Sequence, residues 1–306
     1  MNKTSYLGIF LISTSSLTLE IFLTRFFSIS QGYHFAFMVV SIALLGYGAS
    51  GSFLMLFPSI LRKNTKGLLY ILSLILSFTI IFSYLISNRL PFDIVKFSWD
   101  KNQLFYVFIY YTLLSLPFFL SGMIISITIT KFPAEINRIY FSDLSGASAG
   151  CLIPLLIFPI FGGTGPLLIS SILAFIASVL FIAPNLNKKT IFPIIIAIII
   201  ISTFIIKPYL LEIRISPFKG INIALRYPDS KLIDTKWNSF SRIDVIDSPL
   251  VRFAPGLSLK YLESLPSQVG ITIDGDRMTA ITELKDGISN LNFVGTLGFG
   301  PRTSTL

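Results

Sequence analysis

The sequence has almost none of the residues that form disulfides and multi-ligand metal sites. Cys151 is the only cysteine and His34 the only histidine among 306 residues. A single cysteine inside an apolar stretch excludes an intramolecular disulfide and a cysteine-based metal site. A single histidine excludes a metal centre built from several imidazoles. We therefore expect no metal site in this chain.

Charge is also scarce, and this decides the class of protein. Charged residues make up 13% of the sequence and hydrophobic residues 53%, whereas a soluble domain carries about 25% charged residues. The mean hydropathy is +0.77. A water-soluble fold could not bury so much apolar surface. The sequence predicts an integral, multi-pass membrane protein whose main partner is the lipid bilayer.

The net charge of +9 is shared unequally along the chain. Residues 1–206 carry 12 basic and 5 acidic side chains, whereas residues 207–306 carry 12 and 10. The basic excess therefore lies in short loops between apolar segments, as in loops that face anionic lipid at the cytoplasmic surface. This pattern places the N-terminus in the cytoplasm, and we expect no binding to nucleic acid.

Long apolar runs predict an all-α polytopic bundle over residues 1–206. A bilayer-spanning helix needs roughly 20 mostly apolar residues. We expect about seven spans, with six to eight compatible with the pattern, because the last run is short. An odd count would place the two ends of the chain on opposite sides of the membrane. The predicted spans are residues 6–24, 36–61, 68–86, 104–129, 144–161, 167–183 and 191–206.

Composition changes after this region, and residues 207–290 predict a small β-rich module. Alternating apolar and polar residues at 242–247, 270–274 and 278–284 are typical of strands. The tripeptide Asp274-Gly275-Asp276 between two of these runs indicates a turn. Residues 291–306 show no periodicity, so we expect a disordered tail there.

Small residues at helical spacing predict where helices pack in the bilayer. Gly146 and Gly150 form a small-x-x-x-small pair, and Gly46 and Ser50 form another. Lipid is as apolar as leucine, so membrane helices associate best where small residues let backbones approach closely. These four residues are our predicted helix-packing positions.

Four ionisable residues form a candidate intramembrane polar site, namely Glu20, Arg25, His34 and Asp143. Ionisable groups in membrane helices are costly and often mark ligand or proton pathways. Each also has a structural interpretation. Glu20 and Arg25 would form an interfacial pair with Arg25 reaching the headgroups, His34 would lie in an aromatic–polar belt, and Asp143 would cap a helix beginning at 144.

Three passages together resemble the multi-spanning, spermidine synthase-like membrane proteins of bacteria. They are LEIFLTRFFS at 19–28 with GYHFAF at 32–37, YFSDLSGASAG at 140–150, and KWNSFSRIDV at 236–245 ahead of IDGD at 273–276. In that family a helix bundle precedes a polyamine aminopropyltransferase-like domain. The resemblance implies the bacterial inner membrane as the location, and a β-rich lead-in to the transferase at 207–290.

The resemblance also implies a Rossmann-like domain that binds decarboxylated S-adenosylmethionine or S-adenosylmethionine. We find no residues in this sequence that would form such a nucleotide-binding domain. Gly295, Gly298 and Gly300 lack the strand–turn–helix context that makes a glycine-rich loop bind a nucleotide. We therefore expect no catalytic residues, no cofactor and no activity in this chain by itself. Its expected role is to anchor an aminopropyl- or methyltransferase domain missing from a truncated or frame-shifted chain.

Two other readings remain open at the sequence level. The bundle could be transporter-like, moving polyamines or other small cations past Glu20 and Asp143. Ion-coupled transporters usually carry several charges or broken helices in mid-span, and the predicted spans at 68–86, 104–129, 167–183 and 191–206 have no charged residue in their cores. The bundle could also act with a separate transferase domain, or as a homo-oligomer.

Overall fold

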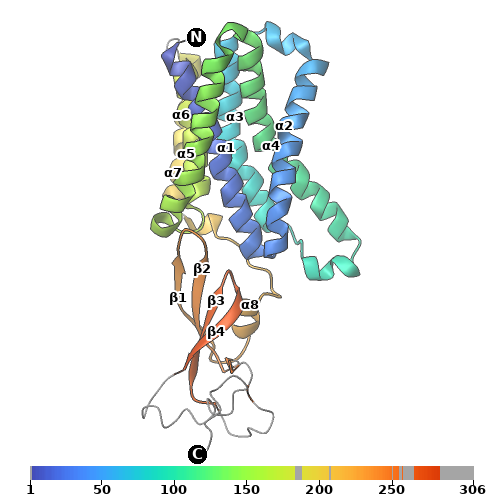
Figure 1. Cartoon of the computed structure of the whole chain (residues 1–306), viewed down its shortest axis with the longest axis vertical. Helices are drawn as coiled ribbons and strands as arrows, with labels where there is room; N and C mark the ends of the chain where they lie inside the picture. The colour runs from blue at the N-terminus through green and yellow to red at the C-terminus, as the bar shows by residue number, and fades with distance from the viewer. Residues whose placement is uncertain are drawn as a thin grey trace, which may run out of the picture. The chain divides into compact units, whose positions relative to one another are not determined.

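A computed structural model of the chain describes residues 2–182, 188–206, 208–249, 251–254, 257 and 265–282 (Figure 1). The chain divides into two compact units. The first comprises Met1–Arg214 with Trp237–Phe240, and the second comprises Ile215–Lys236 with Ser241–Leu306. The first is a helix bundle and the second contains a small sheet. The predicted tail at 291–306 lies outside the described residues.

The first unit is built of long helices joined by short 3-10 turns. Among the described residues, six stretches are long and apolar enough to cross a membrane, and each corresponds to one predicted span. A further helix, α7, covers the run at 191–206, and its role as a seventh span remains a prediction. The helices are α1 (Lys3–Ser30), α2 (Met38–Leu56), α3 (Thr65–Arg89), α4 (Asn102–Lys131), α5 (Ile136–Phe161), α6 (Gly165–Ile182) and α7 (Lys188–Ile206).

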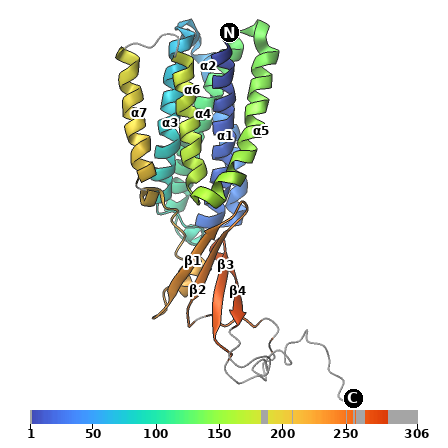
Figure 2. The ribbon, with the colours of Figure 1, turned by 90° about the vertical axis from the view of Figure 1, so that its left-hand side faces the viewer.

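Packing within the bundle places α1 and α3 inside and α5 at its side. Helix α1 packs against α5 and α6, α3 packs against α6 and α4, and α2 packs against α4. The most apolar window of α1 is 61% buried, whereas that of α5 is only 22% buried. Helix α7 packs against α6 and lies at the edge of the bundle (Figure 2). The α5 surface left open is apolar, as expected for a surface that faces lipid.

Helix α5 corrects one sequence-based interpretation. It begins at Ile136, about two turns before Asp143. The interpretation of Asp143 as a helix cap is therefore wrong. Hydropathy located only the most apolar part of this helix, because its first two turns mix polar and apolar residues. The helix ends at Phe161 because the next residue, Gly162, adopts φ +70°. Glycine takes that conformation without steric cost.

The four predicted packing residues lie at close helix contacts. An added Cβ at Gly146 would collide with the carbonyl group of Phe10, and one at Gly150 would lie 2.7 Å from the carbonyl oxygen of Thr14. Both contacts join α5 to α1. On α2, a Cβ at Gly46 would lie 2.6 Å from the carbonyl oxygen of Ser115 on α4, and Ser50 is buried against Gly122 of the same helix.

Two outlying segments belong to the bundle unit. The chain around and after the 3-10 turn Pro208–Leu211 is hydrogen-bonded to the end of α3, where Tyr84 donates to the Leu211 carbonyl at 2.7 Å. Asn88 of α3 donates to the Glu212 carbonyl and accepts from the Arg214 N–H. Within the same unit, the Trp237 ring stacks on Phe158 with centroids 6.1 Å apart. Phe240 remains 75% exposed.

The second unit contains a four-stranded sheet in the order β1-β2-β3-β4. The strands are β1 (Lys231–Trp237), β2 (Arg242–Asp247), β3 (Gln268–Ile273) and β4 (Asp276–Thr282), and β3 pairs antiparallel with both β2 and β4. The short helix α8 (Gly220–Ala224) supplies Ile221 and Ala224 to a core with Ile246. Positive φ angles of 53° at Asp274 and 76° at Gly275 form the tight turn between β3 and β4.

Candidate functional site

Four consecutive hydroxyl residues in the middle of α1, Ser13 to Ser16, organise the polar interior of the bundle. Successive residues on a helix point about 100° apart, so this tetrad faces several neighbours at once. Ser13 donates to Asp143 on α5, and Thr14 donates to the Gly146 carbonyl at 2.9 Å. On the other sides, Ser15 donates to Ser170 of α6 and Ser16 accepts from Tyr47 of α2. One short segment therefore connects α1 to three helices.

The tetrad continues into a line of serines that crosses the bundle. Ser15 Oγ and the Ser170 carbonyl oxygen lie 2.7 Å apart, and Ser170 Oγ returns a bond of 2.6 Å to the Ser15 carbonyl. The next residue, Ser171, donates to the Ser77 carbonyl of α3 at 2.9 Å. All four serines are fully buried. Neutral hydroxyls thus link α1, α6 and α3 without placing a charge in the apolar interior.

The glycine positions of α5 and the hydroxyls of α1 act together. Thr14 reaches the Gly146 carbonyl and Thr18 the Gly150 carbonyl, at 2.9 and 3.3 Å. These bonds require the two backbones to approach closely, which the missing side chains at Gly146 and Gly150 allow. The sequence pattern indicated the glycines. It did not indicate the hydroxyls that use the space.

Two of the predicted ionisable residues lie beside the tetrad. Glu20 is one turn after Ser16 on α1, and Asp143 accepts the hydroxyl of Ser13. Both carboxylates are near enough to the Tyr47 hydroxyl to interact with it electrostatically. Glu20 is half-buried, and no hydrogen bond or ion pair reaches its carboxylate from the part of the chain that the structure describes. The structure therefore brings Glu20 and Asp143 to the same polar region.

The other two predicted residues lie elsewhere. Arg25 is five positions after Glu20, which turns it about 140° around α1, and it has a partner of its own. His34 lies outside α1, in the 3-10 helix Tyr33–Phe37, where it is exposed and its ring centroid is 3.7 Å from that of Tyr33. The four ionisable residues therefore do not form one site.

The second unit has two ion pairs, each with a buried member, that the sequence did not reveal. Arg242 bonds Asp244 through Nε at 2.9 Å and Nη2 at 2.8 Å, and Thr235 donates to the same carboxylate oxygen. Lys219 is 4% exposed, pairs with Asp276 at 3.3 Å and donates to the Asp274 carbonyl. Burial lowers the pKa of the Lys219 ammonium, while Asp276 acts in the opposite direction. No spacing in the sequence pairs residues 219 and 276, which are joined only by the fold.

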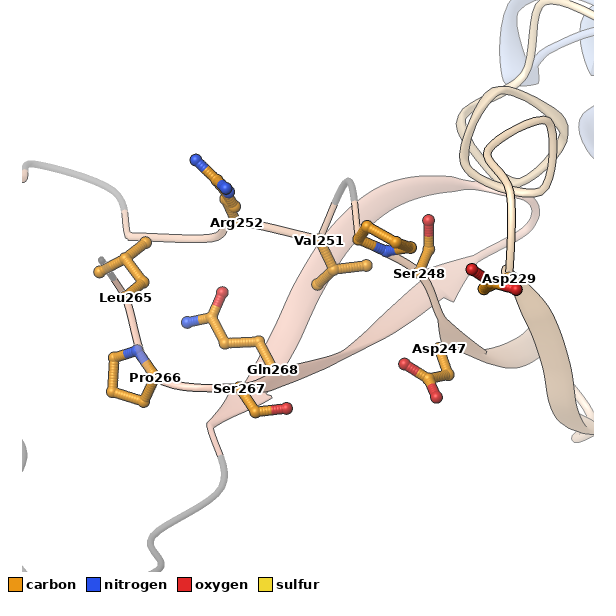
Figure 3. A pocket seen from close by; sticks show the side chains of 10 residues that line it. Asp229, Asp247, Ser248, Val251, Arg252, Leu265, Pro266, Ser267 and Gln268 are labelled. Atoms are coloured by element: carbon orange, nitrogen blue, oxygen red, sulfur yellow. The ribbon is translucent and has the colours of Figure 1, made fainter.

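The second unit also contains a polar pocket of about 330 Å³ (Figure 3). In Figure 3 the carboxylates of Asp229 and Asp247 lie at one end and Arg252 at the other. The side chain of Gln268, between them, is already hydrogen-bonded to Phe253. Its amide oxygen accepts from the Phe253 N–H at 2.7 Å, and its amide nitrogen donates to the Phe253 carbonyl at 3.0 Å. Among the described residues this pocket presents carboxylates and hydroxyls, and no glycine-rich loop of the kind that holds a nucleotide phosphate.

Comparisons of the chain with protein-family models, with curated proteins and with solved structures find no match. Within the part of the chain that the structure describes, six helices are long and apolar enough to cross a membrane, which supports a membrane protein on physical grounds.

Proposed function

We propose that this chain is the membrane-embedded part of a spermidine synthase-like protein, and that it anchors an aminopropyl- or methyltransferase domain at the bilayer. The observation that carries the proposal is how the bundle uses its polar groups. The Ser13–Ser16 tetrad and the serines on α3 and α6 are committed to helix–helix hydrogen bonds. Such bonds hold helices in fixed positions, which suits an anchor. The passages that resemble the family, and a sheet after the bundle, support the same role.

The experiment that tests the anchor is an activity assay on membranes. The coding DNA would be expressed in three versions, each of which reads the nucleotides after codon 282 in a different frame. Membranes from each version would be assayed for aminopropyl transfer from decarboxylated S-adenosylmethionine. We expect membrane-bound transfer from one frame and none from the 306-residue chain. Absence of a transferase in every frame would contradict the proposal. Binding of the nucleotide to the 306-residue chain in calorimetry would contradict the placement of the active site outside it.

We include α7 as a seventh span in this proposal. Its 19 residues extend about 28 Å, close to the thickness of the hydrocarbon core. Single cysteines at Asn64 and Asp229, in a Cys151→Ala background, would be labelled with an impermeant maleimide in sealed vesicles. Seven spans predict labelling from opposite sides. Labelling from the same side would remove α7 from the spans, and would also change which pool of nucleotide the transferase meets.

A second candidate function, binding and transport of small cations, is favoured by one observation. Glu20 and Asp143 both lie near the Tyr47 hydroxyl, and Glu20 has no counter-ion among the described residues. An uncompensated carboxylate inside a membrane helix is costly and commonly functional. In proteoliposomes, this function predicts uptake of a radiolabelled polyamine that Glu20→Gln abolishes and Asp234→Asn, an exposed control, leaves unchanged. Absence of uptake by the unmodified chain would reject it.

A further inference from the structure

One end of the bundle contains a cavity of about 240 Å³ whose walls come from four helices. Its polar wall consists of Asn2, which precedes α1, Ser5 in the first turns of α1, and Thr65 and Lys66 at the start of α3. Its apolar wall consists of Leu69 on α3, Phe132 after α4 and Phe181 on α6. Leu69 and Phe181 are almost completely buried, at 3% and 2% exposure. The cavity is therefore amphiphilic, with hydrogen-bond donors on one side and a hydrocarbon floor on the other.

The charges around this cavity are mostly positive. Lys66 lines it, and among the described residues no ion pair neutralises its ammonium group. Lys3 lies between the two lining residues of α1, and Lys131 precedes Phe132. Glu135, the next acidic residue along the chain after Lys131, accepts a hydrogen bond from the Tyr6 hydroxyl. An ammonium, two hydroxyls and an amide are the groups that bind phosphate oxygens.

The geometry points to a binding site for the phosphate of an anionic phospholipid, with its glycerol and upper acyl chain against Leu69 and Phe181. This inference rests on the membrane location of the bundle and not on the transferase. The ends of spanning helices lie at headgroup depth, and basic pockets between helices on the cytoplasmic side bind anionic headgroups. A soluble phosphate would satisfy the polar wall but would leave the apolar wall without a ligand.

The test is native mass spectrometry of the detergent-purified chain with phosphatidylglycerol, phosphatidylcholine or inorganic phosphate. We expect phosphatidylglycerol adducts that outcompete phosphatidylcholine. Lys66→Gln should lower phosphatidylglycerol retention by about fivefold, the effect of one basic residue at a lipid surface. Lys66→Arg should restore it, and Lys101→Gln, an exposed lysine before α4, should not change it.

Three outcomes would overturn the inference. Equal retention of the two lipids would remove the role of headgroup charge. Loss of binding in Lys101→Gln to the same extent as in Lys66→Gln would show a diffuse surface effect. Adducts of inorganic phosphate that depend on Lys66, without lipid adducts, would identify a soluble ligand instead. Thermal melting of each variant, matched to the unmodified chain, separates loss of binding from loss of folding.

Discussion

The serines that link the helices of the bundle and the ion pairs of the second unit are two different ways of burying polar groups. In the bundle, the fully buried polar groups around the tetrad are neutral hydroxyls that bond carbonyls or one another, as in the pair Ser15 and Ser170. In the second unit the buried polar groups include full charges: Arg242 pairs with the fully buried Asp244, and the buried Lys219 pairs with Asp276, whose side chain is 52% exposed. A segment that inserts into lipid must transfer every side chain from water, and a hydroxyl is much less costly to transfer than a charge. A sheet that folds in water can bury a charge when a partner of opposite charge lies beside it.

Breaking the ion pair between Arg242 and Asp244 in the second unit should cause the largest loss of stability. Arg242→Met would leave the fully buried Asp244 carboxylate without its counter-ion, and breaking a buried pair in this way costs about 3–5 kcal/mol. We expect this loss in the free energy of unfolding of the second unit, measured by pulse proteolysis in urea. The double variant Arg242→Met/Asp244→Leu should recover most of it, because neither charge of this pair then remains. If the double variant were as unstable as the single one, the ion pair would not be the cause.

The glycine contacts of the bundle give the next largest effect. Gly146→Leu places a side chain against the Phe10 carbonyl, and overpacking of this kind costs about 3 kcal/mol. The matched control is Gly48→Leu on α2, where a Cβ would meet no atom within 4 Å. Melting in detergent should fall sharply for the first variant and remain near that of the unmodified chain for the second. Equal melting of the two variants would show that α1 and α5 need no close approach.

These glycines also show what the sequence could predict. A small-x-x-x-small repeat and an alternating strand are local patterns, so Gly146, Gly150 and the strand at 242–247 were found at their observed positions. Hydropathy did not give the start of α5, because turns of mixed composition such as Ile136–Asp143 can be helical without being apolar throughout.

Partners that depend on the fold were not predictable. The tetrad Ser13–Ser16 is visible in the sequence, but which helix each hydroxyl meets depends on how α1 is rotated against its neighbours. The pairing of Lys219 with Asp276 depends in the same way on how α8 meets the turn between β3 and β4. The sequence shows which groups are available, and the packing of the elements decides their partners.

A single hydroxyl of the bundle should have a smaller effect than either change above. Ser15→Ala removes its bond to the Ser170 carbonyl and the donor–acceptor contact between the two hydroxyls. Hydrogen bonds within membrane proteins average about 0.6 kcal/mol each, so we expect a loss near 1 kcal/mol. Ser52→Ala, on an exposed face of α2, is the control because its hydroxyl bonds only its own helix. A loss as large as that of Gly146→Leu would mean that the hydroxyls, and not close packing, dominate the bundle.

The smallest effect is a pH dependence of the stability of the second unit. Burial lowers the pKa of Lys219 below its ordinary value of 10.5, against the opposing attraction of Asp276 and Asp274. Between the folded-state pKa and 10.5 the unfolded state therefore binds more protons than the folded state, so the free energy of unfolding rises with pH across that window. Pulse proteolysis at increasing pH should show this rise in the unmodified chain and in Lys236→Met, which changes an exposed lysine. Lys219→Met should abolish it, because a thioether has no proton to lose. A slope that persists in Lys219→Met would assign the titration to another group and would remove the evidence that burying this charge carries a cost in the second unit.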